Sequence, residues 1–128
     1  MKYLIRIICI MFMINQVWAL EEIYQLGDKY LPVIINQKNH TTLSKNCESK
    51  KCTALKILKE VSIKKIDSQA FSGGKNPGAV ICSSTKEGKV IYLKDLSGNE
   101  NTFCIFADKS MASSGTLEFY ARKNDGEK

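Results

Sequence analysis

The chain has a single histidine, His40, among its 128 residues. Serine and cysteine nucleophiles are usually activated by a histidine that a third group orients. His40 stands in a polar stretch without an acidic or cysteine neighbour, and we interpret it as a solvent-exposed loop residue. Neither a G-x-S-x-G elbow nor a G-x-x-x-x-G-K phosphate loop occurs. We therefore expect no catalytic residues, no cofactor and no enzyme activity.

The spacing of metal ligands is missing as well. Structural zinc sites use paired C-x-x-C ligands or nearby histidines. Here Cys47 and Cys52 enclose four residues, and Cys82 and Cys104 lie far apart. The sequence predicts no metal site.

Long apolar runs are also scarce, and the one at the N-terminus has the three parts of a secretory signal. Lys2 and Arg6 precede an unbroken apolar run over 7–14, and Ala19 offers a small residue at a cleavage site. A membrane-spanning helix needs about 20 apolar residues, and this run stops at Asn15. We expect residues 1–19 to be a cleaved signal peptide and the protein to be exported.

Cleavage would leave 109 of the 128 residues, enough for one small domain. The formal net charge falls from +6 to +4, because Lys2 and Arg6 leave with the signal. This mild charge permits weak attraction to anionic membranes or cell-wall polymers. We expect no nucleic-acid partner and a monomeric protein.

Four cysteines remain after Cys9 is removed with the signal, and an even number in a small exported domain predicts two disulfides. Cys47 and Cys52 are too far apart to bridge within one helix, so their pairing requires Cys47 to precede the helix. We expect Cys82, on a helix, to pair with Cys104, on a strand. Spacing does not exclude pairings that exchange these partners.

The first part of the mature chain, residues 20–72, reads as a helical or irregular segment. A short helix ends near Gly27, and an amphipathic helix covers 49–61 with an apolar stripe that includes Leu55 and Leu58. We favour packing of this stripe in the core, although a basic amphipathic helix can also bind membranes. The candidate membrane or partner face consists of Lys50, Lys51, Lys56 and Lys59.

The second part, residues 73–121, reads as a helix followed by an antiparallel hairpin. Asn76 caps the helix and Pro77 suits its first turn, while Gly98 supplies the hairpin turn. Strands are expected over 89–94, 101–107 and 116–120, followed by a flexible tail over 122–128. The expected fold is a small disulfide-stapled α+β domain with short helices on a roughly three-stranded antiparallel sheet.

A set of residues in this part forms a recognisable motif: Asn76, Pro77, Gly78, Cys82, Gly98, Cys104 and Asp108. This motif resembles the exported bacterial domain of unknown function, family 333, whose members often carry a haemolysin label. The resemblance covers about residues 74–120 and implies a periplasmic or secreted bacterial protein. Lys109 stands where that family usually has a glycine, and the last aromatic segment has no tryptophan or cysteine.

Three carboxylates in this part, Asp95, Glu100 and Asp108, fall in or beside turns, where aspartate bonds its own backbone. We interpret them as turn residues. The sequence therefore predicts a non-catalytic binding or structural module with an unknown protein or cell-envelope partner. The alternatives are a membrane-active, haemolysin-like effector and a small protein inhibitor of a hydrolase.

Overall fold

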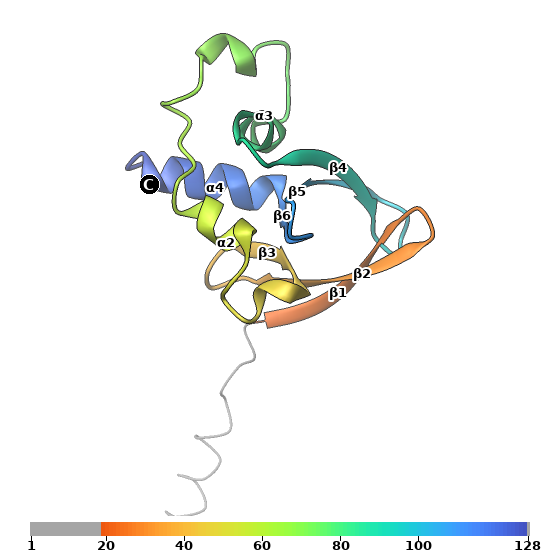
Figure 1. Cartoon of the computed structure of the whole chain (residues 1–128). Helices are drawn as coiled ribbons and strands as arrows, with labels where there is room; N and C mark the ends of the chain where they lie inside the picture. The colour runs from red at the N-terminus through yellow and green to blue at the C-terminus, as the bar shows by residue number, and fades with distance from the viewer. Residues whose placement is uncertain (1–18, 128) are drawn as a thin grey trace, which may run out of the picture.

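The computed structural model describes residues 19–127, so the expected signal peptide lies outside the described residues except for Ala19. Strands and helices follow one another as shown in Figure 1. The elements are β1 (Ala19–Leu26), β2 (Lys29–Asn36), β3 (Thr41–Ser44), η1 (Lys45–Cys47), α2 (Thr53–Leu58), η2 (Ser68–Phe71), α3 (Pro77–Ser84), β4 (Lys89–Lys94), β5 (Glu100–Ile105), β6 (Met111–Ser113) and α4 (Ser114–Asn124).

The six strands form a closed antiparallel barrel in the order β1-β2-β3-β6-β5-β4. The expectation of a three-stranded sheet was therefore wrong. The helix expected to end near Gly27 is strand β1, which turns through Gly27 at φ +57° into β2. Leu20, Ile23 and Tyr24 have helix-like spacing, but only Tyr24 of the three is buried, because β1 packs one face against the barrel interior.

The barrel consists of two three-stranded sheets that meet at narrow seams. The first sheet is β1-β2-β3 and the second is β4-β5-β6. At one seam Leu43 of β3 pairs with Ala112 of β6, and at the other Gln25 of β1 pairs with Lys94 of β4. Because each seam has a single register pair, strand pairing within each sheet is far more extensive than between the sheets.

Two hydrophobic clusters lie on opposite faces of β5. Phe103 points into the barrel, where the cluster also contains Tyr24, Val33, Leu93 and Met111. The next residue on β5, Cys104, belongs to the second cluster, between the barrel and the helices. This alternation explains why β5 is apolar on both faces, and both Phe103 and Cys104 are almost fully buried.

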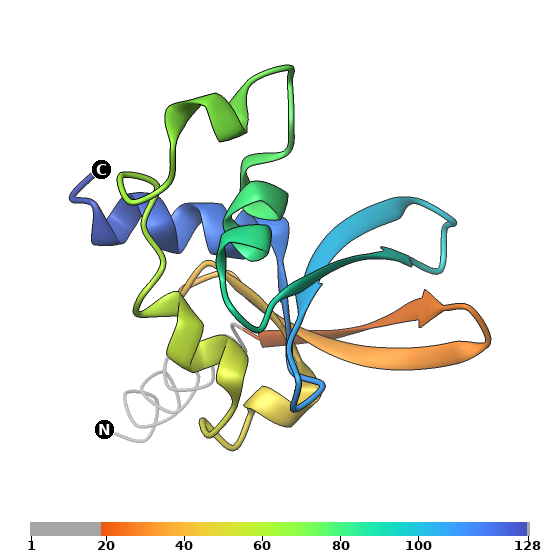
Figure 2. The same cartoon turned by 45° about the horizontal axis from the view of Figure 1, so that its top comes forward.

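The three helices gather at one side of the barrel (Figure 2). The third expected strand, 116–120, is wrong: these residues belong to α4. Ser113 caps α4 by accepting a hydrogen bond from the Thr116 N–H, and Leu117 and Ala121 are buried one turn apart. Phe119, which the strand prediction placed beside Leu117, is exposed.

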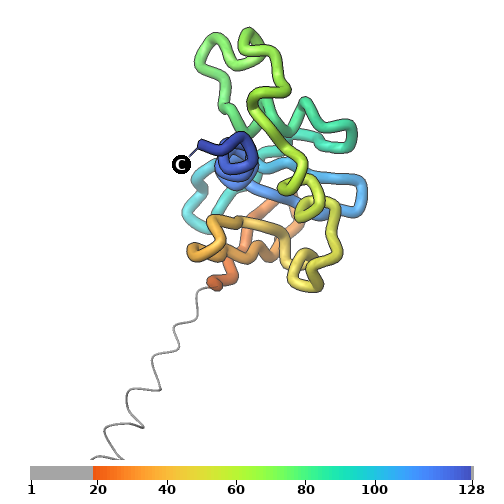
Figure 3. The backbone as a smooth tube through the Cα atoms, turned by 90° about the vertical axis from the view of Figure 1, so that its left-hand side faces the viewer, coloured from red at the N-terminus to blue at the C-terminus, as the bar shows by residue number. Residues whose placement is uncertain are grey.

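Residues 122–127, which the sequence predicted as a flexible tail, begin inside α4 and contact an earlier segment of the chain. Arg122 lies within α4, and the Asp125 carboxylate accepts hydrogen bonds from the backbone N–H groups of Ile63 and Lys64. The side chain of Asn124 donates to the carbonyl oxygens of Leu58, at the end of α2, and Val61, just beyond it. These contacts tie the C-terminal end to the segment between α2 and α3, which extends away from the barrel (Figure 3).

The amphipathic helix expected over 49–61 is reduced to α2, Thr53–Leu58. Cys47 lies before it in η1, and Cys52 is its N-cap residue. This arrangement permits the disulfide between Cys47 and Cys52, as the geometric limit on a continuous helix requires. Val61 is buried beyond the end of α2, so its apolar character does not mark a helical position.

The second disulfide joins Cys82 of α3 to Cys104 of β5, with 5.6 Å between their Cα atoms. The prediction of two disulfides is confirmed, and the exchanged pairings do not occur. Disulfides form and persist in oxidising compartments, so they are compatible with an exported protein. Among residues 19–127, none of the helices has both the length and the apolar character needed to cross a membrane.

Local predictions around α3 were accurate. Asn76 caps the helix by accepting from the Ala79 N–H, with Pro77 at its first position. The hairpin β4–β5 turns over Asp95 to Asn99, and Gly98 adopts φ +85°. These features depend on neighbouring residues alone, which is why the sequence predicted them.

Gly78 sits where α3 crosses the start of α4, and a Cβ atom there would collide with the backbone carbonyl of Ser114. We expect Gly78→Ala to lower the free energy of unfolding by about 1–3 kcal/mol, because backbone must move to admit the methyl group. Gly115→Ala is the matched control, since a Cβ at Gly115 meets no atom within 4 Å. Urea unfolding of the oxidised protein, followed by circular dichroism, measures both. Equal stability of the two variants would contradict the close crossing.

Candidate functional site

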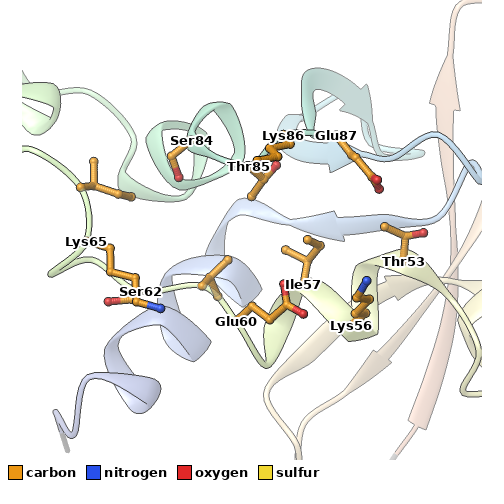
Figure 4. A pocket seen from close by; sticks show the side chains of 12 residues that line it. Thr53, Lys56, Ile57, Glu60, Ser62, Lys65, Ser84, Thr85, Lys86 and Glu87 are labelled. Atoms are coloured by element: carbon orange, nitrogen blue, oxygen red, sulfur yellow. The ribbon is translucent and has the colours of Figure 1, made fainter.

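A cleft of about 450 Å³ lies between α2 and the turn that follows α3 (Figure 4). We call it the α2–α3 cleft. One wall is α2 and the other is the end of α3 with its following turn, while the segment after α2 closes one end. Its lining combines apolar, hydroxyl and charged side chains: Ile57, Val61 and Ile66; Thr53, Ser62, Ser84 and Thr85; and Lys56, Glu60, Lys65, Lys86 and Glu87.

Covalent links and hydrogen bonds hold both walls. The disulfide at Cys82 ties the α3 wall to β5, and the disulfide at Cys52 ties the start of α2 to the preceding turn. Thr85 donates to the Cys82 carbonyl and accepts from the Gly88 N–H, which fixes the turn after α3. A Cβ at Gly88 would lie 2.8 Å from the Cys104 sulfur, so this turn packs tightly against the disulfide. The cleft is therefore largely pre-formed.

The five charged side chains of the α2–α3 cleft take part in no ion pair among residues 19–127. The three ion pairs there join Lys45 to Glu21 and Arg122 to Glu118 and Glu127. The cleft thus presents ammonium groups and carboxylates of both signs, without mutual pairing, beside aliphatic side chains. Such a lining can bind a small ligand that carries both charges and an apolar group.

The hydroxyl groups at the α3 wall are engaged with the backbone. The Ser84 hydroxyl donates to the Ile81 carbonyl, and the Thr85 hydroxyl donates to one backbone carbonyl and accepts from one backbone N–H. The only histidine, His40, lies in the β2–β3 turn and stacks on Phe119 with 4.4 Å between ring centroids. It does not line the α2–α3 cleft, and it occupies a loop as predicted. The arrangement favours binding over nucleophilic chemistry.

The candidate membrane or partner lysines do not share one helical face. Lys50 and Lys51 precede α2, Lys56 lines the α2–α3 cleft, and Lys59 is the C-cap residue. The apolar stripe that includes Leu55 and Leu58 packs in the core, where Leu58 is only 2% exposed.

A second opening, of about 690 Å³, lies along α3 and β4. We call it the α3–β4 groove. Its lining is mainly apolar, and it shares Ile66 and Ser84 with the α2–α3 cleft. Of the residues that the sequence singled out, Lys56 lines the cleft and Asn76 lines the groove, but the openings themselves were not predicted, because each combines side chains from segments distant in the chain. The residues of this groove are Ile66, Ala70, Lys75, Asn76, Ala79, Val80, Ser83, Ser84, Val90, Tyr92 and Thr102.

Asp108 does more than close its own turn. Its carboxylate accepts from the Ser110 N–H and hydroxyl, and also from the Thr53 N–H at the start of α2, at 2.8 Å. The Ser110 hydroxyl in turn accepts from the Ala54 N–H. The turn between β5 and β6 therefore caps α2 from a distance of more than fifty residues in sequence. Asp108 is a turn residue, as interpreted, but nothing in the sequence indicated its second role at α2.

The same contacts determine the pKa of Asp108. Burial opposes ionisation, but hydrogen bonds from Ser110 and Thr53 outweigh it and lower the pKa to about 2. Lys109 adopts φ +66° in this turn, a conformation that glycine takes with less strain. Asp95 behaves as predicted and bonds its own turn, where hydrogen bonds from Asn99 and Ser97 lower its pKa.

Comparison with protein-family models, curated proteins and solved structures finds no match to this chain. The resemblance to family 333 therefore remains a hypothesis from the motif residues, and function must be inferred from the geometry.

We expect Asp108→Asn to destabilise the protein by about 1 kcal/mol near neutral pH, because it weakens the cap of α2. The carboxylate has a lower pKa in the folded state, so it stabilises the fold above about pH 4, the unfolded value, and this contribution disappears as the pH falls toward about 2. The difference from the parent protein should therefore shrink over this acid range. Glu100→Gln, at an exposed position, is the control. A pH-independent difference in urea unfolding would contradict the ionised cap.

Leu58→Asp should unfold the protein, because it places an unpaired charge in the core and costs more than about 3 kcal/mol. Lys59→Gln, one residue later and exposed, should change stability by less than about 0.5 kcal/mol. Circular dichroism and thermal unfolding distinguish the two. A folded Leu58→Asp variant that has lost binding to anionic vesicles would instead favour a membrane-docking stripe.

Proposed function

We propose that this protein is an exported, non-catalytic binding module and that the α2–α3 cleft is its binding site. The observation that carries this proposal is a set of five charged side chains of both signs that line the cleft beside apolar residues and form no ion pair within residues 19–127. The cleft volume lies in the range of about 300–1,000 Å³ that is usual for small-ligand sites.

The ligand class that fits this lining is a short peptide with free termini. Lysine ammonium groups, such as those of Lys65 and Lys86, would receive the peptide carboxylate, and Glu60 or Glu87 would receive its amino group. An aliphatic side chain of the peptide would cover Ile57. Exposed ion pairs contribute about 0.2–1 kcal/mol each, so we expect weak affinity, on the order of millimolar.

The binding module is preferred to the membrane-active effector because the apolar residues of α2 are used in packing. Leu58 and Ala54 are buried, and α2 has only six residues. An interfacial helix would need its apolar side free to enter the lipid boundary.

The test uses the ¹⁵N-labelled oxidised protein, produced from the full sequence by export, and the tripeptide Ala-Leu-Ala with free termini. We expect saturable amide shifts confined to the cleft walls, around Ile57, Glu60 and Thr85. Acetylation and amidation of the peptide termini should weaken binding by about tenfold, because they remove both charges. The absence of shifts at these amides for both peptides would refute the site.

Two further measurements sharpen the result. Lys86→Glu should weaken binding of the free tripeptide, whereas Lys38→Glu, an exposed change in the β2–β3 turn, should leave it unchanged. Chromatography of the recovered peptide tests the non-catalytic part of the proposal. Hydrolysis that tracks with the purified protein would contradict it.

A further inference from the structure

Strand β4 has one edge without a strand partner along most of its length. The Asp95 N–H bonds the Asn99 carbonyl, so the alternation of an antiparallel pair directs the backbone groups of Lys94, Tyr92 and Val90 away from β5. Lys94 pairs with Gln25 of β1. Among residues 19–127, no hydrogen bond reaches the N–H or C=O groups of Tyr92 and Val90 on that side.

The barrel itself cannot close this edge. Continuing the register of Gln25 with Lys94 would place Gly27 opposite Tyr92. The chain turns at Gly27 and returns as β2, so β1 ends before it can cover the rest of β4. The edge left free therefore follows from the length of β1.

The free edge borders the α3–β4 groove on the outer face of the sheet. Val90 and Tyr92 line this groove, and Tyr92 is 58% exposed. A strand added along β4 would direct every second side chain toward the groove, where Val80 and Ala79 of α3 supply an apolar wall. Strand addition of this kind obtains affinity from backbone hydrogen bonds and selectivity from the pockets for alternate side chains.

The charges beside this edge favour a particular partner. Lys89 and Lys94 stand at the two ends of β4, and Lys75 lines the groove. None of the three takes part in an ion pair among the described residues. Lysines at an edge oppose pairing with a second copy of β4, which would bring further lysines and no carboxylate. An acidic partner strand would complement them.

We propose that β4 accepts an extended peptide, apolar at its centre and acidic at both ends, as an additional strand along Lys89–Leu93. This interaction surface is separate from the walls of the α2–α3 cleft and goes beyond the function proposed for that cleft. It assigns the α3–β4 groove as the site for alternate side chains of the peptide.

The direct test is amide hydrogen exchange of the oxidised full-length product with the peptide acetyl-Glu-Thr-Val-Thr-Val-Glu-amide. We expect added protection at the Val90 and Tyr92 amides, weaker binding at high salt, and binding reduced by about tenfold when both glutamates are replaced by lysine. The blocked termini prevent this peptide from satisfying the ligand class proposed for the α2–α3 cleft.

Tyr92→Pro removes the edge N–H without removing a bond to β5, and edge strands tolerate proline at such positions. It should reduce binding by about tenfold or more, whereas Tyr92→Thr, which keeps the N–H, should bind within about threefold of the parent protein. Should Tyr92→Pro fail to fold, Lys89→Glu with Lys94→Glu provides the alternative. That double variant should prefer the lysine-flanked peptide.

Four results would overturn the proposal. The first is saturation without protection at Val90 and Tyr92. The second is equal binding by Tyr92→Pro and Tyr92→Thr. The third is a dimer that protects these amides in the absence of peptide, because the occupant of the edge would then be a second copy of the chain. Peptide shifts confined to the α2–α3 cleft would also reject strand addition while leaving that cleft as a binding site.

Discussion

The burial of β5 on both faces is the constraint on which the rest of the structure depends. Phe103 fills the barrel interior, and Cys104 on the opposite face is bonded to α3. The barrel interior and the helical layer therefore pack on opposite faces of β5, and neither can shift without disturbing the other. Gly88 allows the turn before β4 to approach the same disulfide, so the position of β4 depends on it too.

The motif residues named for the resemblance to family 333 have structural roles at helix ends, a helix crossing and a turn. Asn76 starts α3, Gly78 permits its crossing with α4, and Asp108 caps α2. Gly98 shapes the hairpin turn. A motif composed of such residues describes how a chain packs, and it carries no information about a ligand.

Helix α3 and the segment before it separate the two candidate surfaces. Ile66 and Ser84 border both the α2–α3 cleft and the α3–β4 groove. Within the part of the chain that the structure describes, the cleft presents charges of both signs without ion-pair partners, whereas the groove lies beside backbone groups of β4 without hydrogen-bond partners. The two surfaces therefore suit different partners, a small charged ligand and an extended strand, and one fixed helix positions both.

The sequence by itself determined the features that depend on near neighbours: the N-terminal cap of α3, the hairpin β4–β5, and the turn roles of Asp95 and Gly98. It also indicated both disulfides through the even number of cysteines that follow the N-terminal apolar run. The prediction of secondary structure failed in the first part of the chain, where Leu20, Ile23 and Tyr24 fit a helical period as well as a strand.

Only the tertiary structure decided that β1 to β3 complete a barrel, because a strand gains its stability from partners remote in sequence. For the same reason the sequence did not predict the cap of α2 by Asp108, the lining of the two openings or the free edge of β4. Each is a relation between segments that the chain brings together only after folding.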